Sequence, residues 1–117
     1  MAYRFERLEI WKTAIEYAKR IYQLTENFQK HEVYGLTSQL RRAAVSVSSN
    51  IAEGSASDSD REFRNFLNYA IRSVAEIVSE LNIAKAMGYL DDKEFRLSYD
   101  ESEVLIKRIT SFRKTLS

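Results

Sequence analysis

Residues 59–86 read SDREFRNFLNYAIRSVAEIVSELNIAKA, and this stretch decides the fold class. Its opening, Ser59 to Glu62, matches the S-x-x-E capping box, in which serine and glutamate satisfy backbone donors left free at a helix start. Apolar residues then return every four and three positions, on one helical face: Phe63, Leu67, Ala70, Val74, Ile77, Leu81 and Ala84. Gly88 follows as a helix-ending glycine. The pattern predicts a long central helix over about 60–87.

Three further blocks, at about 8–24, 36–53 and 92–116, show the same rhythm of apolar side chains. Gly54 is predicted to end the second helix as a C′ glycine, and Asp91 to cap the fourth, with Glu94 three residues later. Most connections between the blocks are short, which makes consecutive helices antiparallel neighbours. The sequence therefore predicts an all-α, up-down-up-down antiparallel four-helix bundle, formed as a single domain over 1–117.

Composition narrows the functional classes. The chain has 117 residues with no cysteine, and it carries 18 basic against 17 acidic side chains. The net charge of +1 provides no global attraction to nucleic acid or anionic lipid, although residues 1–50 and 104–117 are net basic and residues 51–103 net acidic. No secretory signal and no apolar run long enough to span a membrane is visible. We expect a cytoplasmic protein with no membrane partner.

Candidate catalytic and metal-binding residues are few. His31 is the only histidine and falls in the predicted first loop, without ligands at metal-site spacing. Glu76 and Glu80 lie one turn apart on the third helix, but the Glu-x-x-His motifs of di-metal bundles are missing, so a solvated face is favoured for both. We expect no enzyme activity, no catalytic residue, no metal, no cofactor and no small-molecule substrate.

The second helix carries a polar stripe beside its apolar one. Its members recur at spacings of four and three residues: Gln39, Ala43, Ser46, Asn50 and Glu53. Polar groups close to a core need hydrogen-bond partners. In one interpretation they satisfy helix ends and loop amides within the bundle. In the other, Gln39, Ser46, Asn50 and Glu53 form a polar surface used between subunits or toward a ligand.

The first helix carries a second apolar stripe of Trp11, Ile15, Ala18 and Tyr22. Apolar stripes without a partner usually mark interfaces. Trp11 and Tyr22 are therefore candidate interface residues, and the first hypothesis is a non-enzymatic, homo-oligomeric scaffold or interaction module.

The second hypothesis is binding of RNA or DNA through basic patches. In an up-down bundle the fourth helix ends where the first begins, so Arg4, Arg7, Arg113 and Lys114 are expected to share one end. Arg41 and Arg42 form a further basic pair on the second helix. Helix-dipole compensation and solubility are the simpler roles for these side chains, and oligomerisation is a way to multiply a weak patch.

The segment from Tyr34 to Gly54 resembles the hallmark of the bacterial large-subunit rRNA intervening-sequence proteins. The matching strings are Tyr34-Gly-Leu, Gln39-Leu-Arg-Arg-Ala, Val45-Ser and Ser49-Asn-Ile-Ala-Glu-Gly54, with Leu8-Glu-Ile-Trp11, Glu62-Phe-x-x-Phe-Leu67, Ser73 with Glu76, and Gly88-Tyr-Leu90 outside the segment. The resemblance implies a four-helix bundle that assembles as a ring-shaped homopentamer. It also implies kinship with retroelement accessory proteins that bind nucleic acid, although near-neutral charge argues against a simple transfer of that activity.

Overall fold

A computed structural model describes residues 2–117 and places four α-helices and two short 3-10 helices in that range, with no strand. The α-helices are α1 (Glu9–Thr25), α2 (Leu36–Ser55), α3 (Asp60–Ala86) and α4 (Asp92–Arg113). The 3-10 helices are η1 (Arg4–Arg7), before α1, and η2 (Lys30–Glu32), between α1 and α2.

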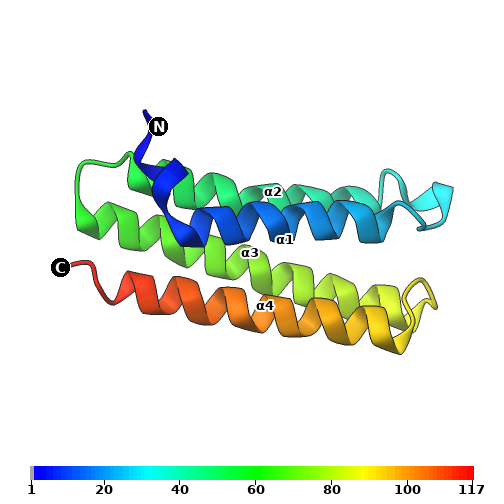
Figure 1. The fold of residues 1–117 in the computed structure, drawn as a ribbon. Coiled ribbons are helices and arrows are strands. Elements are labelled where there is room, and N and C mark those ends of the chain that lie inside the picture. The colour runs from blue at the N-terminus through cyan, green and yellow to red at the C-terminus, as the bar shows by residue number, and fades with distance from the viewer. Residues whose placement is uncertain (1) are drawn as a thin grey trace.

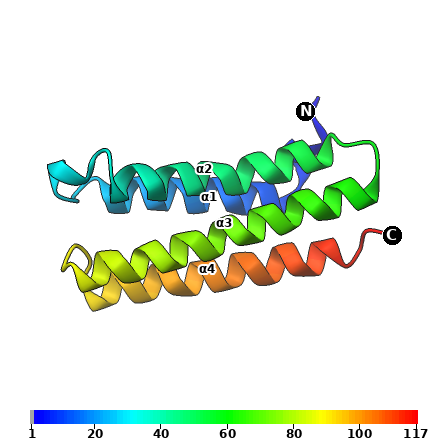
Figure 2. The ribbon, with the colours of Figure 1, turned by 180° about the vertical axis from the view of Figure 1, so that it is seen from behind.

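The four helices run side by side along an elongated bundle of 44 × 23 × 22 Å. Figure 1 shows α1 and α4 on the near side, and Figure 2, from behind, shows α2 and α3 in front. Consecutive helices alternate in direction, and the two ends of the chain lie at the same end of the bundle. The prediction of an all-α, up-down-up-down antiparallel bundle is confirmed.

Capping residues set the boundaries of α3 and α4. Ser59 Oγ accepts a hydrogen bond from the Glu62 amide at 3.1 Å. At the start of α4 both halves of the box form, because Asp91 Oδ1 accepts from the Glu94 amide at 2.7 Å and Glu94 Oε1 accepts from the Asp91 amide at 3.1 Å. Gly88, with φ of +80°, turns the chain out of α3 as predicted, since glycine adopts this left-handed conformation without steric penalty.

Gly54 has a different role from the predicted one. The helix α2 continues through Gly54 to Ser55, and Gly54 does not have a positive φ. A Cβ atom at Gly54 would lie 2.7 Å from Phe63 Cδ1 and 2.8 Å from Phe66 Cβ, both on α3. The glycine is therefore present because α2 and α3 approach too closely for a side chain, and the prediction that it ends α2 was wrong.

The core is formed by the apolar stripes, which face one another across the bundle axis. Buried members come from every α-helix: Ile10, Ala14, Tyr17 and Ile21 from α1; Leu40, Ala44, Val47 and Ile51 from α2; Phe63, Leu67, Val74, Ile77 and Leu81 from α3; Leu105 and Ile109 from α4. Each large apolar side chain buried in this way contributes roughly 1.5–3 kcal/mol. The described helices include none long and apolar enough to cross a membrane.

Candidate interaction surfaces

The polar stripe of α2 lies against a matching stripe of α3. Ser46 Oγ lies 3.0 Å from Ser73 Oγ, and Asn50 Nδ2 donates to the Ser46 carbonyl oxygen at 2.8 Å and to Ser46 Oγ at 3.0 Å. Ser46 and Asn50 are half-buried, whereas Gln39 and Glu53 are exposed. The two interior members thus satisfy one another within the bundle, and the two outer members face solvent.

The contact between Ser46 and Ser73 also sets the register of the two antiparallel helices. Moving two turns toward the start of α2 reaches Gln39, and the same distance along α3 reaches Glu80. The register therefore places Gln39 opposite Glu80 and Ala43 opposite Glu76. We call the strip formed by Gln39, Ala43, Ser46, Asn50, Ser73, Glu76 and Glu80 the polar seam.

Glu80 is the least expected member of the polar seam. Its side chain is buried, with 6% of its surface exposed, and its Oε1 atom has no hydrogen-bond partner among residues 2–117. Burial, together with a hydrogen bond to Glu76 and the charge on Glu76, raises the pKa of Glu80 to about 7. The expectation of a solvated face holds for Glu76, which is exposed, and was wrong for Glu80. Helical spacing places Glu76 and Glu80 on one face of α3, but the closely packed α2 covers only Glu80.

The second apolar stripe of α1 is only partly exposed. Trp11, expected on an open surface, is half-buried because the Phe5 ring of η1 packs edge-on against it, with centroids 4.9 Å apart. Ile15 and Tyr22 remain 39% and 42% exposed. That Trp11 is covered was not predicted from the sequence, because the short helix before α1 was not predicted. The available signal was Phe5, a single apolar residue among charged ones.

Val45 of α2 extends this stripe. The Arg41 guanidinium lies 4.7 Å above the centre of the Tyr22 ring and so connects α2 to α1 at this level of the bundle. One turn along each antiparallel helix come Ala18 and Val45, which therefore lie at about the same level, and the Val45 side chain is 44% exposed. We call Ile15, Ala18, Tyr22 and Val45 the apolar face.

The predicted basic candidates do not form one patch. Arg41 is half-buried and bound at the end of α1, where its Nε donates to Thr25 Oγ1 at 2.9 Å and its Nη2 to the Tyr22 carbonyl oxygen at 3.2 Å. Arg42 is exposed, with Nη2 3.5 Å from Ser38 Oγ. Both lie near the end of α1, away from the chain termini, so Arg41 is a structural residue.

Arg4, Arg7, Arg113 and Lys114 lie at the end of the bundle that holds both termini. The Arg4 guanidinium lies 5.1 Å from the Phe63 ring centre, and Arg113 Nη1 donates to Asn68 Oδ1 at 2.6 Å. Arg4, Arg7 and Lys114 are exposed. We call Arg4, Arg7, Arg113 and Lys114 the basic end.

The basic end also holds an acid. The amide and hydroxyl of Ser117 both donate to Asp60 Oδ2 at 3.0 Å. These hydrogen bonds, assisted by the charges of Arg4 and Arg64, lower the pKa of Asp60. Asp60 is thus an ionised group at neutral pH that weakens the positive potential of this end.

His31 lies at the opposite end of the bundle and joins two connections. Its Nε2 atom lies 3.3 Å from the Tyr89 hydroxyl, which donates to Glu32 Oε2 at 2.9 Å. Glu32 Oε1 accepts from the Leu36 amide at 3.1 Å, and these bonds lower the pKa of Glu32. Within residues 2–117 no cluster of three acidic, histidine or cysteine side chains is placed to hold a metal ion. The arrangement ties the α1–α2 connection to the turn after α3.

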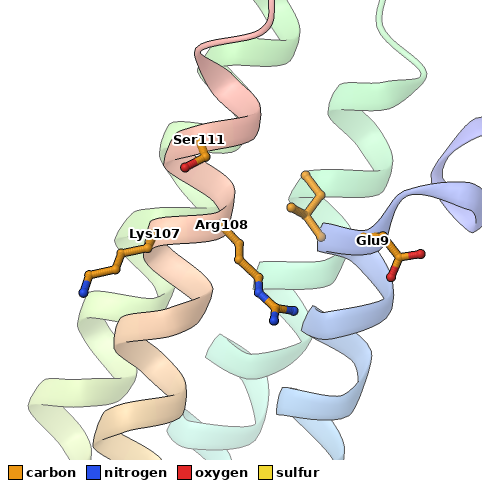
Figure 3. Close-up of a pocket in the computed structure, with 5 residues that line it drawn as sticks. Glu9, Lys107, Arg108 and Ser111 are labelled. Carbon is orange, nitrogen blue, oxygen red and sulfur yellow. The ribbon is translucent and has the colours of Figure 1, made fainter.

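A shallow depression of about 560 Å³ lies between the start of α1 and the last part of α4. Figure 3 shows that its cationic side chains diverge: Arg108 reaches from α4 toward α1, whereas Lys107 points to the other side. Arg108 Nη1 donates to Thr13 Oγ1 at 3.1 Å, and Glu9 points away from both. Because these charges do not converge, the depression lacks the geometry of a ligand site.

These features define the class of protein: a four-helix bundle that presents a polar seam, an apolar face and a basic end on a well-packed core. Residues 6–111 match the 23S rRNA-intervening sequence protein family, and the chain belongs to that family. None of the curated proteins matches it. A crystal structure from the S23 ribosomal protein family of Bacteroides thetaiotaomicron, a protein with unknown function, is similar with a TM-score of 0.79. The similarity covers 90% of this chain and 98% of that chain, and at 23% identity it shows the fold alone.

Proposed function

We propose that this chain is a non-enzymatic scaffold of the cytoplasm that works as a homo-oligomer and joins its copies through the sides of the bundle. The observation that carries the proposal is the apolar face. Ile15, Tyr22 and Val45 stay substantially exposed in the single chain, on two adjacent helices. Side chains of this kind, gathered on one surface, favour association because burial removes them from water. The family resemblance implies five copies in a ring.

Oligomeric state is the direct test. Multi-angle light scattering after size-exclusion chromatography is expected to give a mass several times the 13.7 kDa of one chain, five times for a pentamer. The double variant Ile15→Lys/Val45→Lys places two charges on the apolar face, and we expect it to raise the dissociation constant by at least about a hundredfold, because each buried lysine requires a partner.

A matched control uses an exposed apolar side chain away from the apolar face. Met87, just after α3, is 57% exposed, and Met87→Lys is expected to assemble as the wild type does. Circular dichroism checks that all three proteins are equally helical. A wild-type chain that stays monomeric at micromolar concentration contradicts the proposal, and so does equal assembly of the double variant.

The basic end supports a second candidate function, binding of RNA through phosphate contacts. Arg4, Arg7 and Lys114 are exposed together there, and an oligomer repeats the cluster in every copy. Phosphate contacts make such binding strongly dependent on salt. We expect a structured RNA fragment to bind at ~50 mM salt and to bind much more weakly at ~200 mM, as measured by gel shift.

Charge-neutral variants separate this function from non-specific attraction. Arg7→Gln/Lys114→Gln is expected to reduce both the RNA affinity and its salt dependence, because each lost phosphate contact lowers the salt slope. Arg42→Gln removes an exposed charge outside the basic end and serves as control. Absence of salt-sensitive binding, or an equal effect of the two changes, contradicts RNA binding through the basic end.

A further inference from the structure

The polar seam contains an acid whose surroundings are incomplete in the single chain. Glu80 is nine-tenths buried, yet Oε1 has no donor in the described part of the chain, and no salt bridge joins Glu80 to a cation there. By contrast, Ser46, Asn50 and Ser73 bond to one another two turns away. The hydrogen bond with Glu76 joins Glu80 to another acid and supplies no positive charge, and a buried carboxylate without a cation is strongly disfavoured, so Glu80 is a position that a cation from outside would stabilise.

The neighbouring elements place no positively charged side chain against the Glu80 carboxyl group. On its own helix, Glu76 is the titratable group that acts on it, and it is also acidic. On α2 the register brings the uncharged Gln39 opposite Glu80, and Arg42, one turn further along that helix, directs its guanidinium to Ser38. The α4 helix packs on another side of α3, where Lys85 pairs with Asp92. Arg72, one turn before Glu76, stacks on Tyr69, and within residues 2–117 no salt bridge joins a cation to Glu76 or Glu80.

We propose that the polar seam docks a second copy of this chain, and that a lysine or arginine side chain of that copy binds Glu80. The inference rests on the proposed homo-oligomeric function and names the surface and the ion pair that complete it. Ala43, opposite Glu76, is buried, whereas Glu76, one turn from Glu80, is exposed, so a long side chain arriving from outside meets the two acids at Glu76. The site is complete only when the second copy is present.

Charge complementarity selects a second copy as the occupant. Lys19 is exposed on α1 between Ile15 and Tyr22 and forms no ion pair within residues 2–117. Arg42 is exposed on α2, one turn before Val45. The apolar face is thus flanked by unpaired cations, whereas the polar seam carries two acids. A contact between two different surfaces repeats from copy to copy and closes into a ring when its rotation allows.

Docking of the cation is expected to make association depend on pH. In the free chain the pKa of Glu80 is about 7, and a cation at hydrogen-bond distance lowers it. Each contact therefore releases up to one proton from the Glu80 carboxyl to solvent, and association strengthens as pH rises. For one such proton, the dissociation constant is expected to be about tenfold lower at pH 8 than at pH 6.

The experiment compares wild-type chain with Glu80→Gln by sedimentation velocity at pH 6 and pH 8, in buffer with EDTA so that no divalent ion bridges the acids. Glutamine keeps the size and hydrogen-bonding capacity of the side chain but cannot form the ion pair. We expect Glu80→Gln to associate at least about tenfold more weakly at pH 8. Its association should also lose the rise between the two pH values. Glu103→Gln, which removes an exposed acid from α4, should behave as the wild type.

The outcomes distinguish the two proposals. A wild-type chain that is monomeric at both pH values, with EDTA and without it, contradicts the proposed function and this inference together. An oligomer that Glu80→Gln leaves unchanged in affinity and pH dependence contradicts this inference alone, and so does assembly that EDTA abolishes, which would place a metal ion at the acids. Helicity of Glu80→Gln equal to that of Glu103→Gln, and a monomer melting temperature at least as high, exclude loss of folding as the cause of weaker association.

Discussion

Arg41 Nε donates to Thr25 Oγ1 across 2.9 Å, and the same hydroxyl donates to the Ile21 carbonyl oxygen at 2.8 Å. Through this pair a side chain of α2 reaches the unpaired carbonyl groups at the end of α1, and its guanidinium also stacks on Tyr22. Hydrogen bonds from α2 thus complete the last turn of α1.

Arg41→Ala is expected to lower the free energy of unfolding by about 2 kcal/mol, because it removes charged hydrogen bonds to two acceptors and a cation–π contact. The neighbouring Arg42→Ala is expected to change it by less than about 0.5 kcal/mol, since Arg42 is exposed. Guanidinium unfolding at one fixed chain concentration measures both. Equal values for the two variants would show that the Arg41 contacts do not contribute.

Gly54→Ala is expected to destabilise the bundle by about 1–3 kcal/mol, although alanine is the better helix former by roughly 1 kcal/mol. The added Cβ would meet Phe63 and Phe66 at less than 3 Å, so α2 and α3 must move apart. Glu53→Ala, an exposed site in the same turn, is the control and should be neutral or slightly stabilising. Thermal melting followed by circular dichroism separates the two, and a stabilised Gly54→Ala would contradict the close approach.

The buried hydroxyl pair of Tyr17 and Ser102, 2.6 Å apart, joins α1 to α4. A double-mutant cycle with Tyr17→Phe and Ser102→Ala is expected to give a coupling free energy of about 1 kcal/mol. Burial raises the pKa of Tyr17 well above its ordinary value, so the coupling should be constant from pH 6 to pH 9. Denaturant titrations of the four proteins measure it, and additive single effects would mean that the pair does not stabilise the bundle.

Glu80 is expected to make the dissociated chain less stable as pH rises. Its folded pKa of about 7 lies above the ordinary 4.5, so the folded chain holds the proton more tightly than the unfolded chain. The contribution is therefore fully favourable below about pH 4.5 and is lost as pH rises through about 7. The free energy of unfolding that is lost over this pH interval is at most about 3 kcal/mol.

Glu80→Gln removes this titration. Below the association threshold, the variant is expected to be more stable than wild type at pH 8 and to differ little at pH 4.5. Urea unfolding of dilute chain across that interval tests the sign, and a wild-type stability that rises from pH 5 to pH 8 relative to Glu80→Gln would contradict the raised pKa. The stabilising effect on the single chain is opposite to the expected weakening of the oligomer, so one substitution tests both.

The sequence by itself determined the four helices, their alternating direction and most of the core. Apolar side chains such as Leu67, Val74 and Leu81 return at the helical period, and only side-by-side packing of the blocks removes them from water. Ser59, Asp91 and Gly88 mark boundaries that local backbone hydrogen bonding requires. Such features depend on neighbours within a few residues along the chain, which is why they can be read from it.

Only the tertiary structure decided which polar and charged side chains are free. Glu76 and Glu80 share a helical face, yet α2 covers one and not the other. Arg41 belongs to a basic pair in sequence but is bound to Thr25, and Trp11 is covered by Phe5. The reason is physical: burial and desolvation depend on how closely two helices approach. That distance is determined by small residues such as Ala43 and Gly54 meeting side chains of another helix, which no local pattern specifies.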